Sequence, residues 1–188
     1  LKSLDVNSTN AGICRRTLSS EVLKVSVSYT KDIIRKLVER KLLWEDLKRM
    51  MSHPKDENRF EKYIEVLQDL TGWKEKIVLP LSEHLLIIGK DGSLIIRALC
   101  GHEFGDYREN WKLKTLVYVR DTVEKIEEIY SGPTRPEPEW CEIREYICPG
   151  CGTMLDVEAV PPGYPILNEF QPDIETFYTK WLKNPVPT

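Results

Sequence analysis

The chain has 188 residues, 41% of them hydrophobic and 30% charged, which is ordinary for one folded domain or one core with an appended module. Its net charge of −3 argues against a dedicated nucleic-acid-binding protein, because such domains usually carry an excess of basic residues. No apolar run approaches the roughly 20 residues that a membrane span needs, and residues 1–10 do not resemble a secretory signal. The five cysteines are odd in number and include a CxxC pair, which favours metal binding in a reducing cytoplasm over a disulfide framework.

Residues 1–28 are predicted to be an N-terminal extension. The segment begins with polar residues, and Cys14 within it is interpreted as a free thiol. Residues 21–27 alternate weakly between apolar and polar side chains, so they predict a short strand or an arm that binds a partner.

A helical hairpin is predicted over residues 29–72. Thr30 is a suitable N-cap, and apolar residues recur at helical spacing from there to the break at His53-Pro54. A second helix is expected from about Lys55 to Asp69, with Gly72 as its stop signal.

From residue 73 the pattern changes to short strands, which predicts a zinc-stabilised β-rich domain over 73–160. Gly89-Lys90-Asp91-Gly92 has the composition of a hairpin turn between two apolar strands. Residues 104–110 are expected to form a polar loop, followed by a strand over 113–119 and a short helix that begins at Asp121 or Thr122. A last hairpin is predicted over 142–157, with a metal at its tip.

Residues 161–188 form a proline-rich C-terminal segment in which Pro172-Asp173 begins a short helix. The predicted fold class is therefore α+β: a helical hairpin, a small antiparallel sheet with a zinc-ribbon-like site, and a short C-terminal helix.

The segment Cys148-Pro149-Gly150-Cys151-Gly152 has the spacing of a metal knuckle, in which both thiolates reach one ion. Cys100-Gly101-His102 is the second half of the predicted site, and we expect the two pieces to meet across one antiparallel sheet. The predicted zinc ligands are Cys100, Cys148, Cys151 and His102, with Cys141 as the alternative fourth ligand. A closed site rich in thiolate is structural, because it leaves no position for a reactive water. A redox role for the CxxC pair is disfavoured because no thioredoxin-like βαβ pattern surrounds it.

The rest of the chain offers little catalytic chemistry. There is no phosphate-binding loop and no HExxH, and His84 is expected at a strand edge without a chemical role. The polar residues Asp106, Arg108, Glu109 and Asn110 are interpreted as a surface loop or a subunit contact. We therefore predict no catalytic residue and no residue that binds an organic cofactor.

Several short segments, taken in order, resemble the gamma subunit of the acetone carboxylase family, which includes the related acetophenone carboxylase. The similarity runs from about Tyr29 to Pro187. The segments that carry it are Pro54-Lys55-Asp56, Tyr63-Ile64-Glu65-Val66-Leu67-Gln68, Cys100-Gly101-His102-Glu103-Phe104, Asn110-Trp111-Lys112-Leu113, Val119-Arg120-Asp121-Thr122, Cys148-Pro149-Gly150-Cys151-Gly152-Thr153 and Pro172-Asp173-Ile174-Glu175.

The resemblance implies an ATP-dependent ketone carboxylase of the cytoplasm that joins bicarbonate to acetone or acetophenone and forms a β-keto acid. It implies large hydantoinase-like alpha and beta subunits as partners, which would bind ATP and a divalent metal, and a structural zinc on this chain. No nucleic acid and no membrane are expected. Acetone carboxylase gamma subunits resemble C-x-C-G-H at the first half-site, where this chain has Ala98, and this departure favours an acetophenone-type relative. The alternative function is a zinc-ribbon module that binds nucleic acid or protein, and a self-contained metalloenzyme would require an open position on the zinc.

Overall fold

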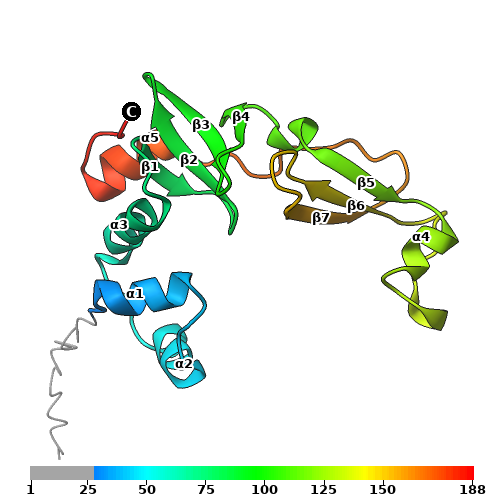
Figure 1. Cartoon of the computed structure of the whole chain (residues 1–188), viewed down its shortest axis with the longest axis horizontal. Helices are drawn as coiled ribbons and strands as arrows, with labels where there is room; N and C mark the ends of the chain where they lie inside the picture. Colours follow the sequence, from blue (N-terminus) through cyan, green and yellow to red (C-terminus); the bar gives the residue numbers. More distant parts are fainter. Residues whose placement is uncertain (1–27) are drawn as a thin grey trace, which may run out of the picture.

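A computed structural model describes residues 28–188 of the chain. The predicted strand or arm at 21–27 and the thiol of Cys14 lie outside this range. Within it, helices and two small antiparallel sheets follow one another along the long axis of the molecule (Figure 1). None of the helices in the described range has the length and hydropathy that a membrane span requires.

The N-terminal part contains three helices, α1 (Lys31–Val38), α2 (Trp44–Ser52) and α3 (Arg59–Thr71). The prediction of a single helix from Thr30 to His53 was therefore wrong. The chain leaves helical geometry at Arg40, which has a left-handed φ of 58°, while the apolar spacing continues across the turn and hides the break. Thr30 does cap α1, since its side chain accepts a hydrogen bond from the N–H of Ile33.

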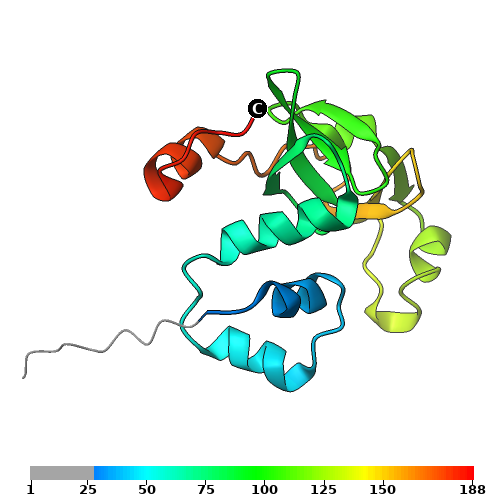
Figure 2. The ribbon, with the colours of Figure 1, turned by 60° about the vertical axis from the view of Figure 1, so that its left-hand side comes forward.

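The third helix begins later than predicted because Asp56 organises the preceding turn. Its carboxylate accepts hydrogen bonds from the N–H groups of Tyr29 and Asn58, at 2.8 and 2.9 Å. The helix ends at Gly72, which has the predicted left-handed conformation with φ 63°. It lies between the first sheet and the other two helices (Figure 2), so its apolar residues Val66 and Leu67 are buried.

The first sheet has the order β1-β2-β3-β4. Its strands are β1 (Lys76–Pro80), β2 (Leu85–Lys90), β3 (Ser93–Ala98) and β4 (Glu103–Asp106). The predicted hairpin turn is confirmed, with positive φ at both Asp91 and Gly92 as a type I′ turn requires. The fourth strand lies where only a loop was expected. It has just four residues, including Gly and Asp, and its pairing with β3 is interrupted by a register shift between Ile96 and Arg97.

The second sheet has the order β5-β6-β7, so the predicted single sheet is in fact two. Its strands are β5 (Leu116–Arg120), β6 (Glu142–Ile147) and β7 (Met154–Val160). The predicted hairpin of β6 and β7 is confirmed. Between β5 and β6 lie α4 (Val123–Glu127), capped by the Thr122 side chain as expected, and the 3₁₀ turn η2 (Gly132–Thr134).

The main core lies on the first sheet and extends toward the second. After β7 the chain runs back along the second sheet to the first, where α5 (Ile174–Thr176) and the π-helical turn η3 (Phe177–Leu182) pack (Figure 1). Asp173 caps this helix, as predicted, and the Tyr178 hydroxyl donates to the Val78 carbonyl at 2.7 Å. The buried residues of this core are Val78, Leu85, Ile87, Ile96, Ala98, Phe104, Trp111, Cys148, Ile174 and Tyr178.

Candidate metal centre

Three cysteines from two separate sheets meet at one point. Cys100 follows β3 of the first sheet, while Cys148 and Cys151 lie in the turn between β6 and β7 of the second. The three sulfur atoms all lie within 4.8 Å of one another. The sulfurs of Cys100 and Cys148 are 3.6 Å apart. The two predicted half-sites are therefore brought together, but across the junction of two sheets rather than within one.

The sulfur spacing fits a shared metal ion. Zinc bonds to thiolate sulfur at about 2.3 Å, so two sulfurs on one tetrahedral zinc lie roughly 3.8 Å apart. The observed 3.6 Å is close to this value and far longer than the bond of a disulfide, which is about 2.05 Å. The donor set, three thiols on turns between strands, also matches that of structural zinc sites.

The local backbone explains why both half-sites carry glycine. Gly101 and Gly152 have φ of 94° and 73°, a region that other residues rarely adopt. Gly152 donates its N–H to the Cys148 carbonyl at 2.9 Å, which closes the knuckle. Gly150 is required for a different reason: a β-carbon there would lie 2.9 Å from the His102 β-carbon and 3.3 Å from the Cys100 sulfur. The two turns thus pack directly against each other.

The environment separates the pKa values of two of the thiols. Hydrogen bonding with the side chain and backbone of Thr153 lowers the pKa of the Cys151 thiol to about 7. Desolvation raises the pKa of the Cys100 thiol, and its neighbouring sulfurs add to the rise because anions close together repel. A divalent cation would remove this repulsion, since a coordinated thiol is held as thiolate.

The two predicted candidates for the fourth ligand, His102 and Cys141, differ in their distance from the three sulfurs. The His102 ring packs edge-on against Phe104, with ring centroids 4.9 Å apart, and its ligand atoms do not join the three-sulfur group. Cys141 precedes β6 whereas Cys148 follows it, so six extended residues separate them by roughly 20 Å. His102 as a zinc ligand stays a prediction.

A hollow of about 310 Å³ adjoins the cysteine cluster, and sequence reasoning did not predict it. His84 lines it because the residue before β2 lies beside the residue after β3, where the Leu99 N–H donates to the His84 carbonyl at 3.0 Å. The lining is His84, Ala98, Leu99, Cys100, Cys151, Thr153 and Leu155.

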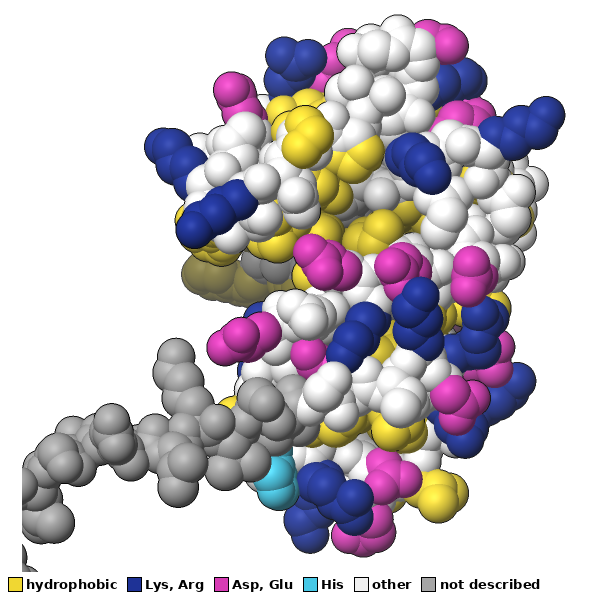
Figure 3. Space-filling view, turned by 90° about the vertical axis from the view of Figure 1, so that its left-hand side faces the viewer, with side chains coloured by type: hydrophobic (Ala, Val, Ile, Leu, Met, Phe, Trp, Pro, Cys, Tyr) yellow, Lys and Arg dark blue, Asp and Glu magenta, His cyan; other side chains and the backbone are white. Residues whose placement is uncertain are grey.

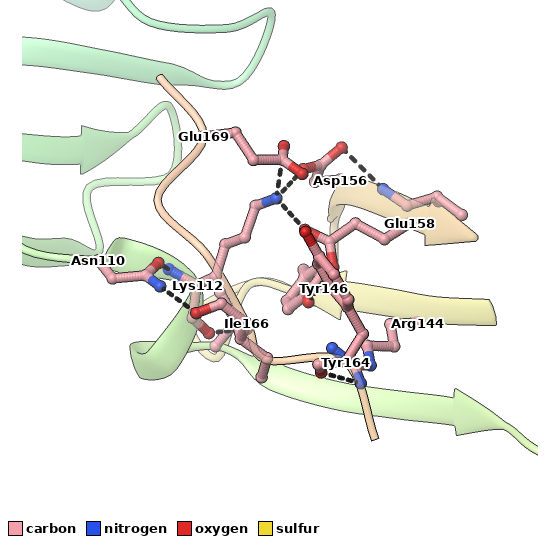
Figure 4. A network of polar contacts seen from close by, with 11 residues as sticks. Asn110, Lys112, Arg144, Tyr146, Asp156, Glu158, Tyr164, Ile166 and Glu169 are labelled. Carbon is pink, nitrogen blue, oxygen red and sulfur yellow. Dashed lines mark hydrogen bonds and ion pairs between the residues drawn. The ribbon is translucent and has the colours of Figure 1, made fainter. Parts of the chain in front are cut away.

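A second group of potential ligands, Asp156, Glu158 and Glu169, is already paired with a lysine ammonium. The ammonium of Lys112, in the 3₁₀ turn η1 (Trp111–Lys114), points into the three carboxylates (Figure 4). It lies 2.9 Å from Asp156 and 3.2 Å from Glu169, and it also pairs with Glu158. This cluster is therefore an internal ion-pair network rather than a metal site.

The network also shifts pKa values in a direction that suits a structural role. Burial alone would lower the pKa of Lys112, but the three carboxylates outweigh it and raise the pKa, so the ammonium stays charged. Burial and the hydrogen bond to Glu158 raise the pKa of Tyr146 to about 12. Both groups therefore keep their protons at neutral pH. Sequence reasoning missed this network because a lysine in a turn is usually exposed.

The polar loop after β4 contains no assembled site. Asp106 pairs with the exposed Arg108, and Asn110 caps η1 while donating to the Ile166 carbonyl at 3.0 Å. These contacts shape the loop and fasten the C-terminal segment, which agrees with the interpretation of a surface loop.

An apolar recess of about 460 Å³ lies between η3 and the helices α1 and α3, on the face shown in Figure 3. Hydrophobic side chains gather in it, and charged side chains of both signs border it. Its lining includes Ile34, Phe60, Tyr63 and Trp181, and 74% of the Trp181 side chain is exposed. The recess offers no polar group arranged for chemistry and is better suited to contacts with another protein.

Comparison with known proteins gives consistent results. The acetone carboxylase gamma subunit family matches residues 71–182. The chain is 48% identical over 163 residues to the acetone carboxylase gamma subunit of Xanthobacter autotrophicus, covering 86% of this chain and 97% of that protein. It is 31% identical over 86 residues to the acetophenone carboxylase beta subunit of Aromatoleum aromaticum, covering 45% of this chain and 67% of that protein.

The longer match, at the higher identity, does not support the leaning toward an acetophenone-type relative. Ala98 therefore gives no argument against membership of the gamma subunit family.

Proposed function

We propose, because this chain belongs to the acetone carboxylase gamma subunit family, that it is the small metal-binding subunit of a ketone carboxylase complex and has no catalytic residue of its own. The observation that carries the proposal is the match over nearly the whole length of the Xanthobacter subunit. The complex would carboxylate acetone, or a related ketone such as acetophenone, with bicarbonate at the expense of ATP. Larger alpha and beta subunits of the hydantoinase type would bind ATP and the divalent metal, and the assembly would work in the cytoplasm.

Zinc on this chain would act as a structural link. Cys100 is attached to the first sheet, whereas Cys148 and Cys151 are attached to the second, so one ion joins both. A structural zinc site contributes directly to folding free energy, because its ligands are brought together only in the folded chain. The metal would thereby fix the angle at which the second sheet projects from the first.

The surface supports a subunit role. Several tryptophans are largely exposed, including Trp140 at 79% and Trp181 at 74%. Large aromatic side chains are enriched at protein interfaces and often dominate their energetics. The charge of −3 gives no electrostatic basis for binding nucleic acid.

The test is co-expression of the tagged chain with large ketone carboxylase subunits from the same organism, followed by purification and assay. We expect a stable complex with ketone- and bicarbonate-dependent ATP hydrolysis, and no such hydrolysis by the purified chain alone. Turnover by the isolated chain would show that it has its own active site. If the large subunits do not co-purify with the tagged chain, the proposed assembly is wrong.

A pair of cysteine variants separates the metal from other thiol effects. The double variant C148S/C151S should lose the bound zinc and most of the complex. The control C141S removes a thiol at the other end of β6 and should retain both. Equal zinc content in the two variants, measured by elemental analysis, would rule out the assigned site.

A further inference from the structure

The three sulfurs of the proposed metal site define a buried side and an open side. Cys148 is fully buried in the core of the first sheet, whereas Cys100 and Cys151 are exposed. Gly150 of the knuckle packs closely against the other half-site, because a β-carbon there would lie 2.9 Å from the His102 β-carbon and 3.3 Å from the Cys100 sulfur.

Within the described part of the chain, no fourth His, Cys, Asp or Glu joins the three sulfurs. On a tetrahedral zinc, an imidazole nitrogen would lie roughly 3.6 Å from each sulfur, given bond lengths of about 2.3 Å to sulfur and 2.0–2.1 Å to nitrogen. Within residues 28–188, no other His, Cys, Asp or Glu ligand atom lies within 4.8 Å of all three sulfurs. His102 is held against Phe104, and Ala98, which faces the site from β3, has no donor.

The hollow of about 310 Å³ adjoins the exposed part of the cluster, since Cys100 and Cys151 line it and the buried Cys148 does not. Liquid water occupies about 30 Å³ per molecule, so the hollow has room for a small organic ligand. Its other walls are mostly apolar, formed by Leu99 and Leu155, while the Thr153 hydroxyl lies 3.2 Å from the Cys151 sulfur. A soft donor with a short apolar body fits such a space better than a hydrated anion.

We propose that the metal's fourth coordination position opens into this hollow and holds an exchangeable ligand, namely water in the resting protein and a small thiol when one is present. Cys100, Cys148 and Cys151 would hold the metal, and a small thiol in the hollow would supply a fourth sulfur donor as thiolate, its proton going to the solvent. No redox step is involved. The inference rests on the metal-binding part of the proposed function and replaces a closed site by a three-cysteine site with one open position.

The experiment uses the full chain loaded with Co²⁺, whose visible spectrum reports the number and type of ligands, with 2-mercaptoethanol as the probe. On titration, the thiolate-to-cobalt charge-transfer absorption should rise by about one third and saturate, because the Co–S bonds increase from three to four. The variants H102A and H84A should respond in the same way as the unmodified chain. Filtration after the titration should show that the cobalt remains with the protein.

The other outcomes are distinct. If the added thiol changes the spectrum of H102A but not that of the unmodified chain, His102 occupies the fourth coordination position. If it changes the spectrum of H84A alone, His84 occupies that position. Loss of cobalt to the added thiol would also overturn the proposal. If no Co²⁺ binds at all, the metal site itself is wrong, whereas co-purification with the large subunits still tests the subunit role separately.

Discussion

Replacing Lys112 by Met is the sharpest test of what fastens the second sheet and the C-terminal segment. The side chain is 4% exposed and meets Asp156 and Glu158 of β7 and Glu169 of the segment that returns to the first sheet. Methionine has similar length and keeps most of the apolar contact, but it removes the ammonium. Glu158 is only 8% exposed, so its carboxylate would stay buried without its counter-charge.

Removing one partner of a buried ion pair typically costs about 3–5 kcal/mol. Asp156 and Glu169 are 38% and 59% exposed, so water screens them and they add little. With a urea m-value of about 1–3 kcal/mol per M, the unfolding midpoint of K112M should fall by at least about 1 M. The measurement is urea unfolding at fixed metal content, followed by tryptophan fluorescence.

Two further variants decide the cause. The double variant K112M/E158Q should recover part of the loss, because the orphaned charge is then absent. Lys114 lies in the same turn and pairs with Glu109 at the surface, so K114M should cost no more than about 1 kcal/mol. If K112M and K114M are equally mild, the network does not stabilise the fold and the reasoning from burial is refuted.

Three other measurements follow from the structure. G150A should lower stability by about 1–3 kcal/mol and weaken metal binding, because its β-carbon would press on His102 and Cys100; an unchanged melting temperature and zinc content would contradict the close approach. Lys62 and the backbone N–H groups that donate to the Asp56 carboxylate lower the pKa of Asp56 below its ordinary 3.8. The ionised carboxylate therefore stabilises the fold fully above pH 3.8, and this stabilisation is lost as pH falls through the folded pKa. The stability gap between wild type and D56N should accordingly be constant from pH 5 to 7 and close only below about 3.8, whereas a gap that changes near neutral pH would point to another group. A zinc chelator should lower the melting temperature of the unmodified chain and leave that of C148S/C151S unchanged, and equal shifts would indicate a non-specific effect.

The elements with strong local signals were predictable from sequence. Asp91-Gly92 specified a type I′ hairpin, Gly72 ended α3, and Thr122 and Asp173 capped their helices, because each depends on contacts within a few residues. The break at Arg40 was missed because nothing in its residue type favours a left-handed φ. The division into two sheets was missed because strand pairing between distant segments leaves no local mark.

The cysteine cluster was predictable for a similar reason. CxxCG is a complete local motif, and Cys100 ends a recognisable strand, so three thiols could be placed near one another. The hollow beside them could not be predicted, because it depends on His84 and Leu99 lying side by side at the ends of two paired strands. Nor could the burial of Lys112, which requires carboxylates from positions far along the chain.

The two polar clusters connect the second sheet to the rest of the molecule. The cysteines hold the β6–β7 turn against the first sheet, while Lys112 holds the middle of β7 and the returning C-terminal segment. The second sheet has a small apolar core of its own: Ile143 and Tyr146 are buried, but the other buried side chains of its strands are Arg120, Arg144 and Glu158. Leu116, Met154 and Val157 are exposed. A sheet so poor in buried apolar area is not stable by hydrophobic burial alone. Its orientation therefore depends on the ionic network at its base, and a metal held by the cysteines would add a second link. The exposed apolar side chains of the sheet stay available for contacts with another protein.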